Sequence, residues 1–338
     1  MRMAIRWTTI IIAVVAGQAA FSASISLSLP ELTWALEIAA PGFVIENKEI
    51  APNGDGARLQ AKNKETGLIL SAFLERAPQT GNSIQCRDYY WGKAEQSPLK
   101  KEQITLYETG GMAVVEYIIP EYQGIPVKQI NLNAYLAKDE YWIDVHVSKV
   151  GHETGDIDPL KPILKSIQIN KSYAPTSADR FDFGNLYYRR RDFAKAIPQY
   201  EKALDIEKQQ PSLDRTIRIV LIDQLGMSYG ISGNLAKSRQ LYEWAVTTEP
   251  KYPMFYYNLA CTFAEMNNLD KAIENLRSAF KYKDNSLPGE SVPDPSTDSS
   301  FAKYRDDPTF KAELGKIRNR SPNQSVQPTR LPVRRPRD

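Results

Sequence analysis

The sequence FGNLY at residues 183–187 returns as LGMSY at 225–229 and as LACTF at 259–263. Each copy has an apolar residue, then glycine or alanine, and an aromatic ring three positions later. A second pattern of small, large and small residues follows each copy at spacings of four and three. These spacings are helical, so each copy predicts two helices joined by a turn. The second pattern lies at Ala196-Tyr200-Ala203, Ser238-Tyr242-Ala245 and Ala272-Leu276-Ala279.

The copies recur after 42 and then 34 positions. An interval of 34 is a helical-repeat period, and the longer interval contains eight additional residues around Gln209-Gln210-Pro211. A small residue at a helix crossing lets two helices approach closely, and the aromatic ring fills the space beside the next hairpin. We therefore expect three helix-turn-helix repeats over residues 177–285.

The pattern resembles that of the tetratricopeptide repeat family, as found in exported bacterial proteins, down to Pro250 after the second copy. The resemblance implies an all-α solenoid whose first helices form a concave groove for a partner peptide. Carried over by position, the groove residues are Phe181, Asn185, Tyr188, Arg189, Asp223, Met227, Tyr257, Cys261 and Glu265. For two of them, Met227 and Cys261, we prefer a role in packing between helices.

Some members of this family hold a partner's terminal carboxylate between lysine and asparagine side chains. Asn185 matches one asparagine of that clamp, but Phe181 stands at the lysine position and Gln224 at the second asparagine position. Asn258 carries an asparagine one repeat too late. The sequence therefore does not predict a carboxylate clamp.

Residues 286–318 predict a loop and capping helices, because Asp298 and the pair Asp307-Pro308 are typical helix starts. Residues 319–338 predict a disordered tail, since prolines there alternate with arginine, glutamine and serine. We expect the apolar side chains of the cap to face the last repeat; they are Phe301, Tyr304, Phe310 and Leu314.

The N-terminal half, residues 31–172, follows the period of two that is typical of strands. Helices are expected at 83–96 and 158–167, which gives an α+β sandwich of antiparallel strands. The arrangement is faintly similar to the PsbP-like sandwich of photosystem extrinsic proteins. The expected strands are 57–61, 68–74, 104–107, 113–119, 127–137 and 141–147.

The first 22 residues have the features of an export signal. Arg2 and Arg6 flank an apolar run over residues 7–16, and small residues follow up to a cleavage position after Ser22. An uncleaved N-terminal anchor is the alternative interpretation, although the run is short for a membrane span. No later apolar stretch spans a bilayer, so we expect a periplasmic or secreted protein without stable membrane insertion after cleavage.

The charge of the chain is concentrated near its ends. The net charge is +3, whereas seven basic residues and one acid give residues 316–338 a charge of +6. Without these residues and the two N-terminal arginines, the body carries −5. A negative body does not favour nucleic-acid binding.

Few residues could support catalysis or metal binding. The chain has two cysteines, Cys86 and Cys261, which either pair across the domains or remain separate buried thiols. Strand alternation places Asp144 and His146 on one face, where Cys86 could act as a nucleophile. Polar residues on one face of an antiparallel sheet are ordinarily just its solvated side, and we prefer that interpretation.

A metal site and a cofactor are not expected. His152, Asp156 and Asp158 lie close in sequence, but the remaining ligands of a calcium loop are absent and helix capping explains the aspartates. The sequence contains no phosphate-binding loop and no dinucleotide fingerprint.

The sequence predicts a non-enzymatic, exported adaptor that binds a protein or peptide partner in the groove of its repeats. The alternative is a hydrolase or a small-ligand-binding function in the sandwich, with the repeats as a docking module. The partner and the oligomeric state are not determined by the sequence.

Overall fold

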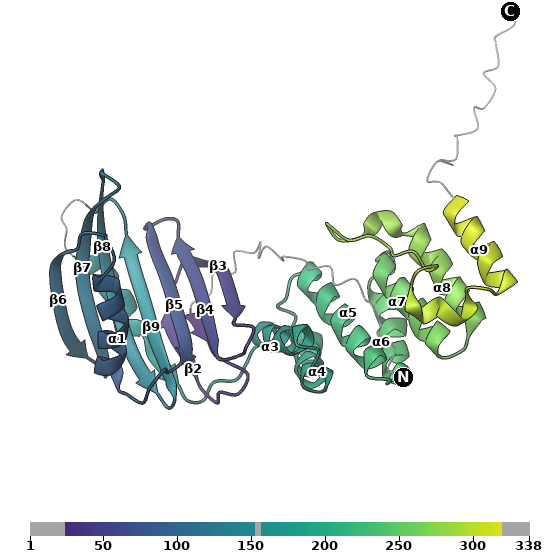
Figure 1. Cartoon of the computed structure of the whole chain (residues 1–338), viewed down its shortest axis with the longest axis horizontal. Coiled ribbons are helices and arrows are strands. Elements are labelled where there is room, and N and C mark those ends of the chain that lie inside the picture. Colours follow the sequence, from purple (N-terminus) through teal and green to yellow (C-terminus); the bar gives the residue numbers. More distant parts are fainter. Residues whose placement is uncertain (1–23, 153–156, 320–338) are drawn as a thin grey trace, which may run out of the picture. The chain divides into compact units, whose positions relative to one another are not determined.

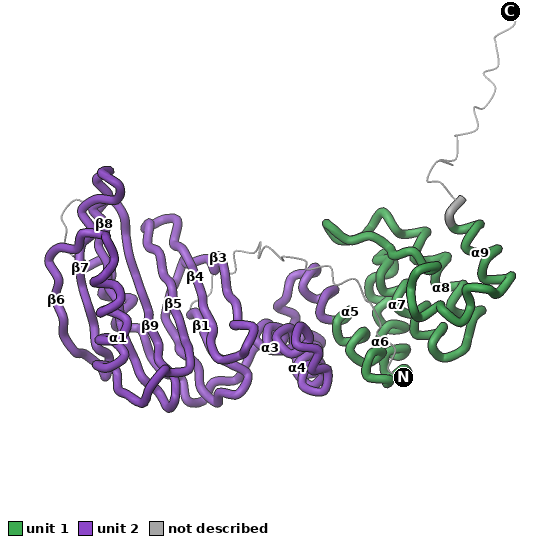
Figure 2. Tube along the Cα trace, in the orientation of Figure 1, with its two compact units in different colours: residues 1–12, 222–338 green, residues 13–221 purple. Residues whose placement is uncertain are grey.

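The computed structural model describes residues 24–152 and 157–319. The chain forms two compact units, which Figure 2 colours separately. Among the described residues, we call those up to 221 the sheet unit and those from 222 onward the helical unit. The predicted signal segment and, beyond Asn319, the predicted tail lie outside the described residues. Within the described ranges, no helix has the length and apolar character needed to cross a membrane.

The sheet unit contains two antiparallel sheets, of seven and three strands (Figure 1). In the larger sheet the strand order is β3-β4-β5-β9-β8-β7-β6. The six predicted strands are confirmed as β4 to β9, with longer bounds than expected. The seven strands are β3 Phe43–Ile50, β4 Gly56–Asn63, β5 Leu68–Arg76, β6 Glu102–Thr109, β7 Met112–Tyr122, β8 Ile125–Lys138 and β9 Tyr141–Lys149.

Four strands are not predicted by the alternation of the sequence. Three of them form the smaller sheet: β1 (Ser24–Leu27), β2 (Ala35–Ala39) and β10 (Gln168–Asn170). They have three to five residues, too few to display a period. The fourth is β3, whose register with β4 shifts between Ile45 and Asn47 and so interrupts the alternation.

The larger sheet is covered on both faces. Helix α1 (Ser83–Glu95) packs on β7, β8 and β9, and its Trp91 joins an apolar cluster with Tyr117. The smaller sheet and α2 (Lys161–Ser166, preceded by η1 Asp158–Leu160) share the core of the other face. Both predicted helices and the α+β sandwich are therefore confirmed.

The first predicted hairpin belongs to the sheet unit. It consists of α3 (Ser177–Arg189) and α4 (Phe193–Gln209), and Phe183 and Leu186 of α3 lie in the main core of the sheet unit. The compact units divide at residues 221 and 222, within α5 (Arg215–Ile231), whereas the sequence places the domain boundary between residues 172 and 177.

An ion pair fixes α3 to the edge strand β3. The Lys48 ammonium lies 2.6 Å from the Asp179 carboxylate, and both side chains are largely buried. Asp179 also closes a capping box with Thr176 at the start of α3. The Asp179 carboxylate thus both caps the start of α3 and binds the neighbouring strand β3.

The helical unit contains the second part of α5 and the helices that follow it. Asn234 and Asn268 cap α6 and α8 through their side chains, at the turns expected from the repeat pattern. The helices are α6 Leu235–Thr248, α7 Pro253–Glu265, α8 Leu269–Lys281, η2 Lys283–Asn285, η3 Ser299–Tyr304 and α9 Pro308–Asn319.

The predicted C-terminal cap is confirmed. Asp298 accepts a hydrogen bond from the Ser300 amide at the start of η3, and α9 begins at Pro308. Phe301 and Phe310 are fully buried and stack with ring centroids 5.5 Å apart. Their burial closes the apolar end of the last hairpin.

Candidate peptide-binding surface

The predicted groove residues lie on α3, α5 and α7, the first helices of the three hairpins. Four belong to the sheet unit and the others to the helical unit, so each set is described separately. The first set comprises Phe181, Asn185, Tyr188 and Arg189; the second comprises Asp223, Met227, Tyr257, Cys261 and Glu265.

The residues on α3 mainly pack against α4. Phe181 is buried beside Tyr200, and Asn185 accepts a hydrogen bond of 2.8 Å from the Tyr200 hydroxyl. Tyr188 is half-buried between aromatic rings, and Arg189 is exposed. Of these four residues, Arg189 is the one whose side chain is mostly open to solvent.

In the helical unit, Asp223 of α5 is joined to α7. Its carboxylate accepts a hydrogen bond of 2.6 Å from the Asn258 side chain, and the Tyr242 hydroxyl donates to its backbone carbonyl. The pKa of Asp223 is raised to about 7, mainly by burial, with a smaller contribution from the Glu290 charge and against the hydrogen bond from Asn258. Asn258 is therefore engaged within the protein, which leaves no carboxylate clamp at this position.

Tyr257 of α7 is covered by the chain's own C-terminal part. Its side chain is completely buried, and its hydroxyl donates to the Asp298 carboxylate at 2.9 Å. The Cys261 sulfur lies 3.9 Å from the same carboxylate. Tyr257 is consequently inaccessible to a partner in this structure, a result that the sequence pattern does not predict.

The segment 287–298, which we call the covering segment, follows α7 from its start. The Tyr252 hydroxyl, just before α7, donates to the Glu290 carboxylate at 2.8 Å, and Leu287 is buried. At the other end of α7, Lys303 donates to the carbonyl of Glu265, whose side chain is exposed. The sequence predicts only a loop here, because residues 287–295 are rich in proline, glycine and serine.

The alternative catalytic group does not have the geometry of a nucleophile and base. The Cys86 thiol donates to the Ile143 carbonyl at 3.7 Å, and its pKa is raised to about 12, mainly by burial and less by the Asp144 charge. A reactive cysteine requires a lowered pKa, so this thiol is in the unreactive form. Cys86 and Cys261 are both free and buried, so the disulfide alternative is wrong.

The polar residues on the same face of β9 are bound to neighbouring strands. His146 contacts the Asn131 side chain at 3.1 Å, and burial lowers its pKa to about 4. Burial raises the pKa of Asp144 to about 6, although the Asn133 side chain donates to it at 2.9 Å. The predicted face is thus correct for Asp144 and His146, but these contacts are those of a packed polar layer.

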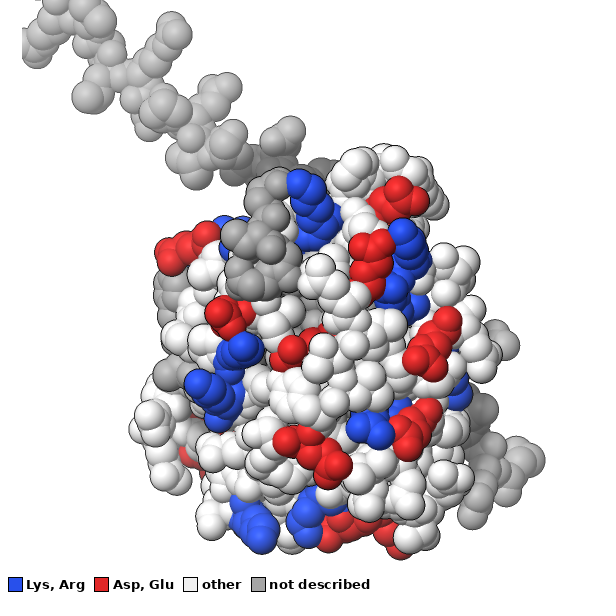
Figure 3. All heavy atoms as spheres, turned by 90° about the vertical axis from the view of Figure 1, so that its left-hand side faces the viewer, with Lys and Arg blue, Asp and Glu red and all other residues white. Residues whose placement is uncertain are grey.

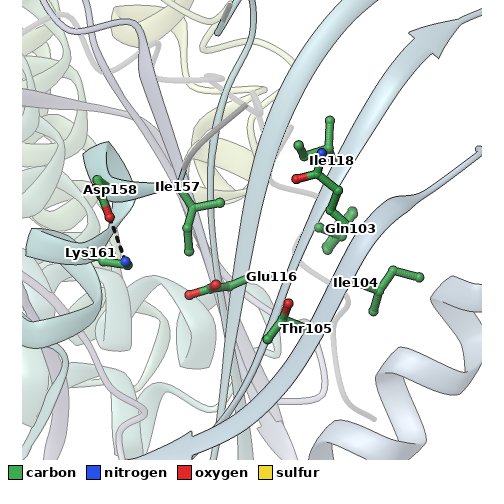
Figure 4. A pocket seen from close by; sticks show the side chains of 9 residues that line it. Gln103, Ile104, Thr105, Glu116, Ile118, Ile157, Asp158 and Lys161 are labelled. Atoms are coloured by element: carbon green, nitrogen blue, oxygen red, sulfur yellow. Dashed lines mark hydrogen bonds and ion pairs between the residues drawn. The ribbon is translucent and has the colours of Figure 1, made fainter. Parts of the chain in front are cut away.

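A hollow of about 340 Å³ lies at the β6–β7 edge of the sheet (Figure 4). Its wall includes Glu116, Asp158 and Lys161, and the Lys161 ammonium binds the Asp158 carboxylate at 2.6 Å. Asp158 therefore forms an ion pair instead of the expected helix cap, while Asp156 lies outside the described residues. In the described ranges, no group of three or more His, Cys, Asp or Glu residues could hold a metal ion.

The face of the molecule drawn in Figure 3 carries both signs of charge. Acidic and basic side chains alternate across it, and the basic ones do not merge into a continuous patch. On this face, the charge distribution does not favour a nucleic acid.

Comparisons with known proteins agree with the helical geometry. Residues 180–210 and 255–286 match the family Tetratricopeptide repeat. These two stretches of the chain are therefore similar to tetratricopeptide repeats. The two matched ranges correspond to the first and third predicted repeats, and the second predicted repeat lies between them.

A curated relative of this chain is the human intraflagellar transport protein 88 homolog. The two are 28% identical over 109 residues, which is 32% of this chain and 13% of that protein. The chain thus spans only a small part of the length of this relative.

Two solved structures with partial similarity to this chain are the tetratricopeptide domain of Sgt2 and PcrH. The Sgt2 domain from Aspergillus fumigatus is 20% identical, with a TM-score of 0.31 over 48% of this chain and 90% of that one. PcrH, solved with the chaperone binding region of PopB, is 13% identical, with a TM-score of 0.29 over 42% and 93%.

Proposed function

We propose that this protein is a non-enzymatic adaptor that binds a segment of a protein partner along the first helices of its repeats. The observation that carries the proposal is the covering segment, an irregular stretch of chain that lies along α7. A helix face that accepts one extended segment through tyrosine hydroxyls and an apolar contact has the chemistry to accept another.

Site-specific crosslinking tests where the partner binds. A photoreactive side chain replaces exposed Arg189 on α3 or exposed Glu265 on α7 in the full chain, and crosslinked proteins are identified by mass spectrometry. Exposed Lys202 on α4 and Glu274 on α8 are the matched control positions. We expect one partner at positions 189 and 265 and none at 202 and 274. Equal crosslinking at all four positions would contradict the proposal.

We also propose that the protein is exported to the periplasm or secreted. The support is the basic and apolar character of residues 1–22, with small residues before the expected cleavage position. Cell fractionation and N-terminal sequencing of the purified chain test this proposal. We expect a mature protein that begins at Ala23, whereas a cytoplasmic chain that retains residue 1 would refute it.

A further inference from the structure

The turn between the two helices of each hairpin has the same backbone geometry in all three repeats. The residue just before the second helix donates its amide, at 2.9 Å, to a carbonyl five positions earlier. These pairs are Asp192 and Tyr187, Asn234 and Tyr229, and Asn268 and Phe263. The residue before each donor has a positive φ, which is 59° at Arg191, 82° at Gly233 and 62° at Asn267. The three turns therefore require the same left-handed conformation.

Arg191 is the least suitable of the three residues for this conformation. Glycine adopts a positive φ at low cost and asparagine at moderate cost, whereas a longer side chain is strained there. Gly233 and Asn267 follow this preference, and Arg191 does not. A glycine would therefore stabilise the turn of the first hairpin, and the arginine costs stability at this position.

Arg191 is the last of three consecutive arginines at residues 189–191, and all three side chains are exposed. Within residues 24–152 and 157–319, none of the three guanidinium groups forms an ion pair. The matching positions of the other two hairpins, residues 231–233 and 265–267, carry a single charge between them, the acid Glu265. The basic cluster is thus particular to the first hairpin and is not a requirement of the repeat.

Contacts with uncharged groups hold two of these arginines against the protein surface. The Arg190 guanidinium lies beside Gly54 of the β3–β4 turn. The Arg191 guanidinium lies 5.8 Å from the centre of the Phe193 ring, which itself packs edge-on against Tyr188. Such contacts restrict the side chains without neutralising their charge, which lowers the entropy lost when an anion binds.

The ends of the two helices determine which kind of anion fits the cluster. Helix α3 ends here, so its free carbonyls are directed toward this end. The adjoining start of α4 is already capped, because the Asp192 carboxylate accepts a hydrogen bond from the Lys195 amide at 3.2 Å. An anion is therefore bound by the guanidinium side chains and not by a cradle of backbone amides. Three neighbouring guanidinium groups suit several carboxylates spaced along a chain, since each can pair with one through two parallel hydrogen bonds.

We propose that Arg189, Arg190 and Arg191 form a binding site for an acidic segment of a protein partner, one that contains several aspartate or glutamate residues in succession. This inference rests on the proposed adaptor function and specifies the partner class. The site lies at the turn between α3 and α4, at the end of the first helix of the hairpin.

Synthetic peptides test the inference without a natural partner. The probe is a fluorescently labelled hexaglutamate, and the reference is hexaglutamine of the same length. Fluorescence anisotropy reports their affinity for the full chain at low ionic strength, and circular dichroism verifies that each variant is folded. The basic tail would also attract the probe, so every chain in the experiment carries the tail substitutions R330Q, R334Q, R335Q and R337Q.

The test variant and its matched control lose the same charge at different places. The test variant carries R189Q, R190Q and R191Q. The control carries K62Q, K64Q and K202Q, which remove three exposed cations elsewhere in the sheet unit. We expect the test variant to bind hexaglutamate at least about tenfold more weakly, and the control to change the affinity by less than about twofold. Hexaglutamine should bind the unaltered cluster at least about tenfold more weakly than hexaglutamate.

The single substitution Arg191→Gly separates binding from folding. It removes one cation and relieves the positive φ, so the affinity for hexaglutamate should fall about threefold while the urea midpoint of unfolding rises. A purely structural role of Arg191 predicts instead that its replacement lowers the urea midpoint.

Four results would overturn the inference: equal affinity for the two peptides, equal loss of affinity in the test and control variants, a lower urea midpoint for Arg191→Gly, or binding of anionic lipid vesicles without binding of hexaglutamate. The last result would assign the cluster to a membrane surface. Failure of the adaptor proposal is a separate result, because it would appear in the crosslinking experiment, whereas these peptides measure the site itself.

Discussion

At two positions of the repeats, glycine is required because any side chain would clash with a neighbouring aromatic ring. A Cβ atom at Gly184 would lie 2.3 Å from the Tyr200 ring, and a Cβ atom at Gly226 would lie 2.3 Å from the Tyr242 ring. Both tyrosines are almost fully buried, so neither ring can move aside without loss of packing. The small residue of the first helix and the aromatic residue of the second helix thus pack directly against each other.

Gly226→Ala is predicted to destabilise the chain by about 2–4 kcal/mol, because overpacking displaces the Tyr242 ring. Gly230→Ala is the matched control in the same helix, since its nearest neighbour would be 3.6 Å from the new Cβ atom. Alanine at that position should be neutral or stabilising by up to about 1 kcal/mol. Urea unfolding measures both variants, and equal effects would contradict the packing argument.

Asp223 is predicted to make stability depend on pH. Its pKa is about 7 in the folded chain and about 3.8 without the effects of folding, so the folded state holds a proton that the unfolded state releases. This contribution is fully present below about pH 4 and is lost as the pH rises to about 7. The free energy of unfolding of Asp223→Asn should therefore exceed that of the wild type by roughly 1–2 kcal/mol at pH 8 and by little at pH 4. Thermal unfolding between pH 4 and 8 measures this, and a pH-independent difference would exclude Asp223 as the source.

At the scale of elements, α3 and the covering segment depend on contacts with distant parts of the chain. Helix α3 has the small residue and aromatic spacing of a repeat, and it also places Phe183 and Leu186 into the sheet core. The covering segment has neither helical nor strand periodicity, yet its Glu290 and Asp298 bind tyrosines beside and within α7. The period of the sequence predicts helix α3, but it gives no indication of where the covering segment lies.

Lys48→Met is predicted to loosen α3 from β3. The substitution removes the cation and leaves the buried Asp179 carboxylate without its ion pair, which should cost about 3–5 kcal/mol. Arg58→Met is the control, because its ion pair with Glu49 is half-exposed and should contribute below about 1 kcal/mol. Hydrogen exchange of α3 and denaturant unfolding report the two effects, and similar losses in both variants would refute the role of burial.

At the scale of the whole molecule, the compact units do not follow the change in secondary structure. The last strand ends at Asn170 and the first repeat helix begins at Ser177, but the sheet unit continues to residue 221. The first hairpin is therefore both a repeat and a part of the sandwich core. The sequence predicts a domain boundary where the apolar period changes from that of strands to that of helices. It does not show that side chains beyond this position are buried in the sheet core.

A fragment that ends at residue 212 is predicted to be more stable than one that ends at residue 172. The shorter fragment lacks Phe183, Leu186 and the carboxylate partner of Lys48. Loss of two buried apolar side chains alone corresponds to roughly 3–6 kcal/mol. Thermal unfolding of the two fragments, each beginning at residue 23, tests this difference. Equal stability would place the boundary where the sequence puts it.

The sequence by itself determined the repeats, six of the seven strands of the larger sheet and the helix starts at Asp298 and Asp307, because each follows from contacts between neighbours a few positions apart. It also indicated which helices supply the candidate surface. Only the tertiary structure decided that α3 lies in the sheet unit, that Cys86 is an unreactive buried thiol and that residues 287–298 cover α7. These features depend on burial and charge between residues far apart in the chain, which no local period records.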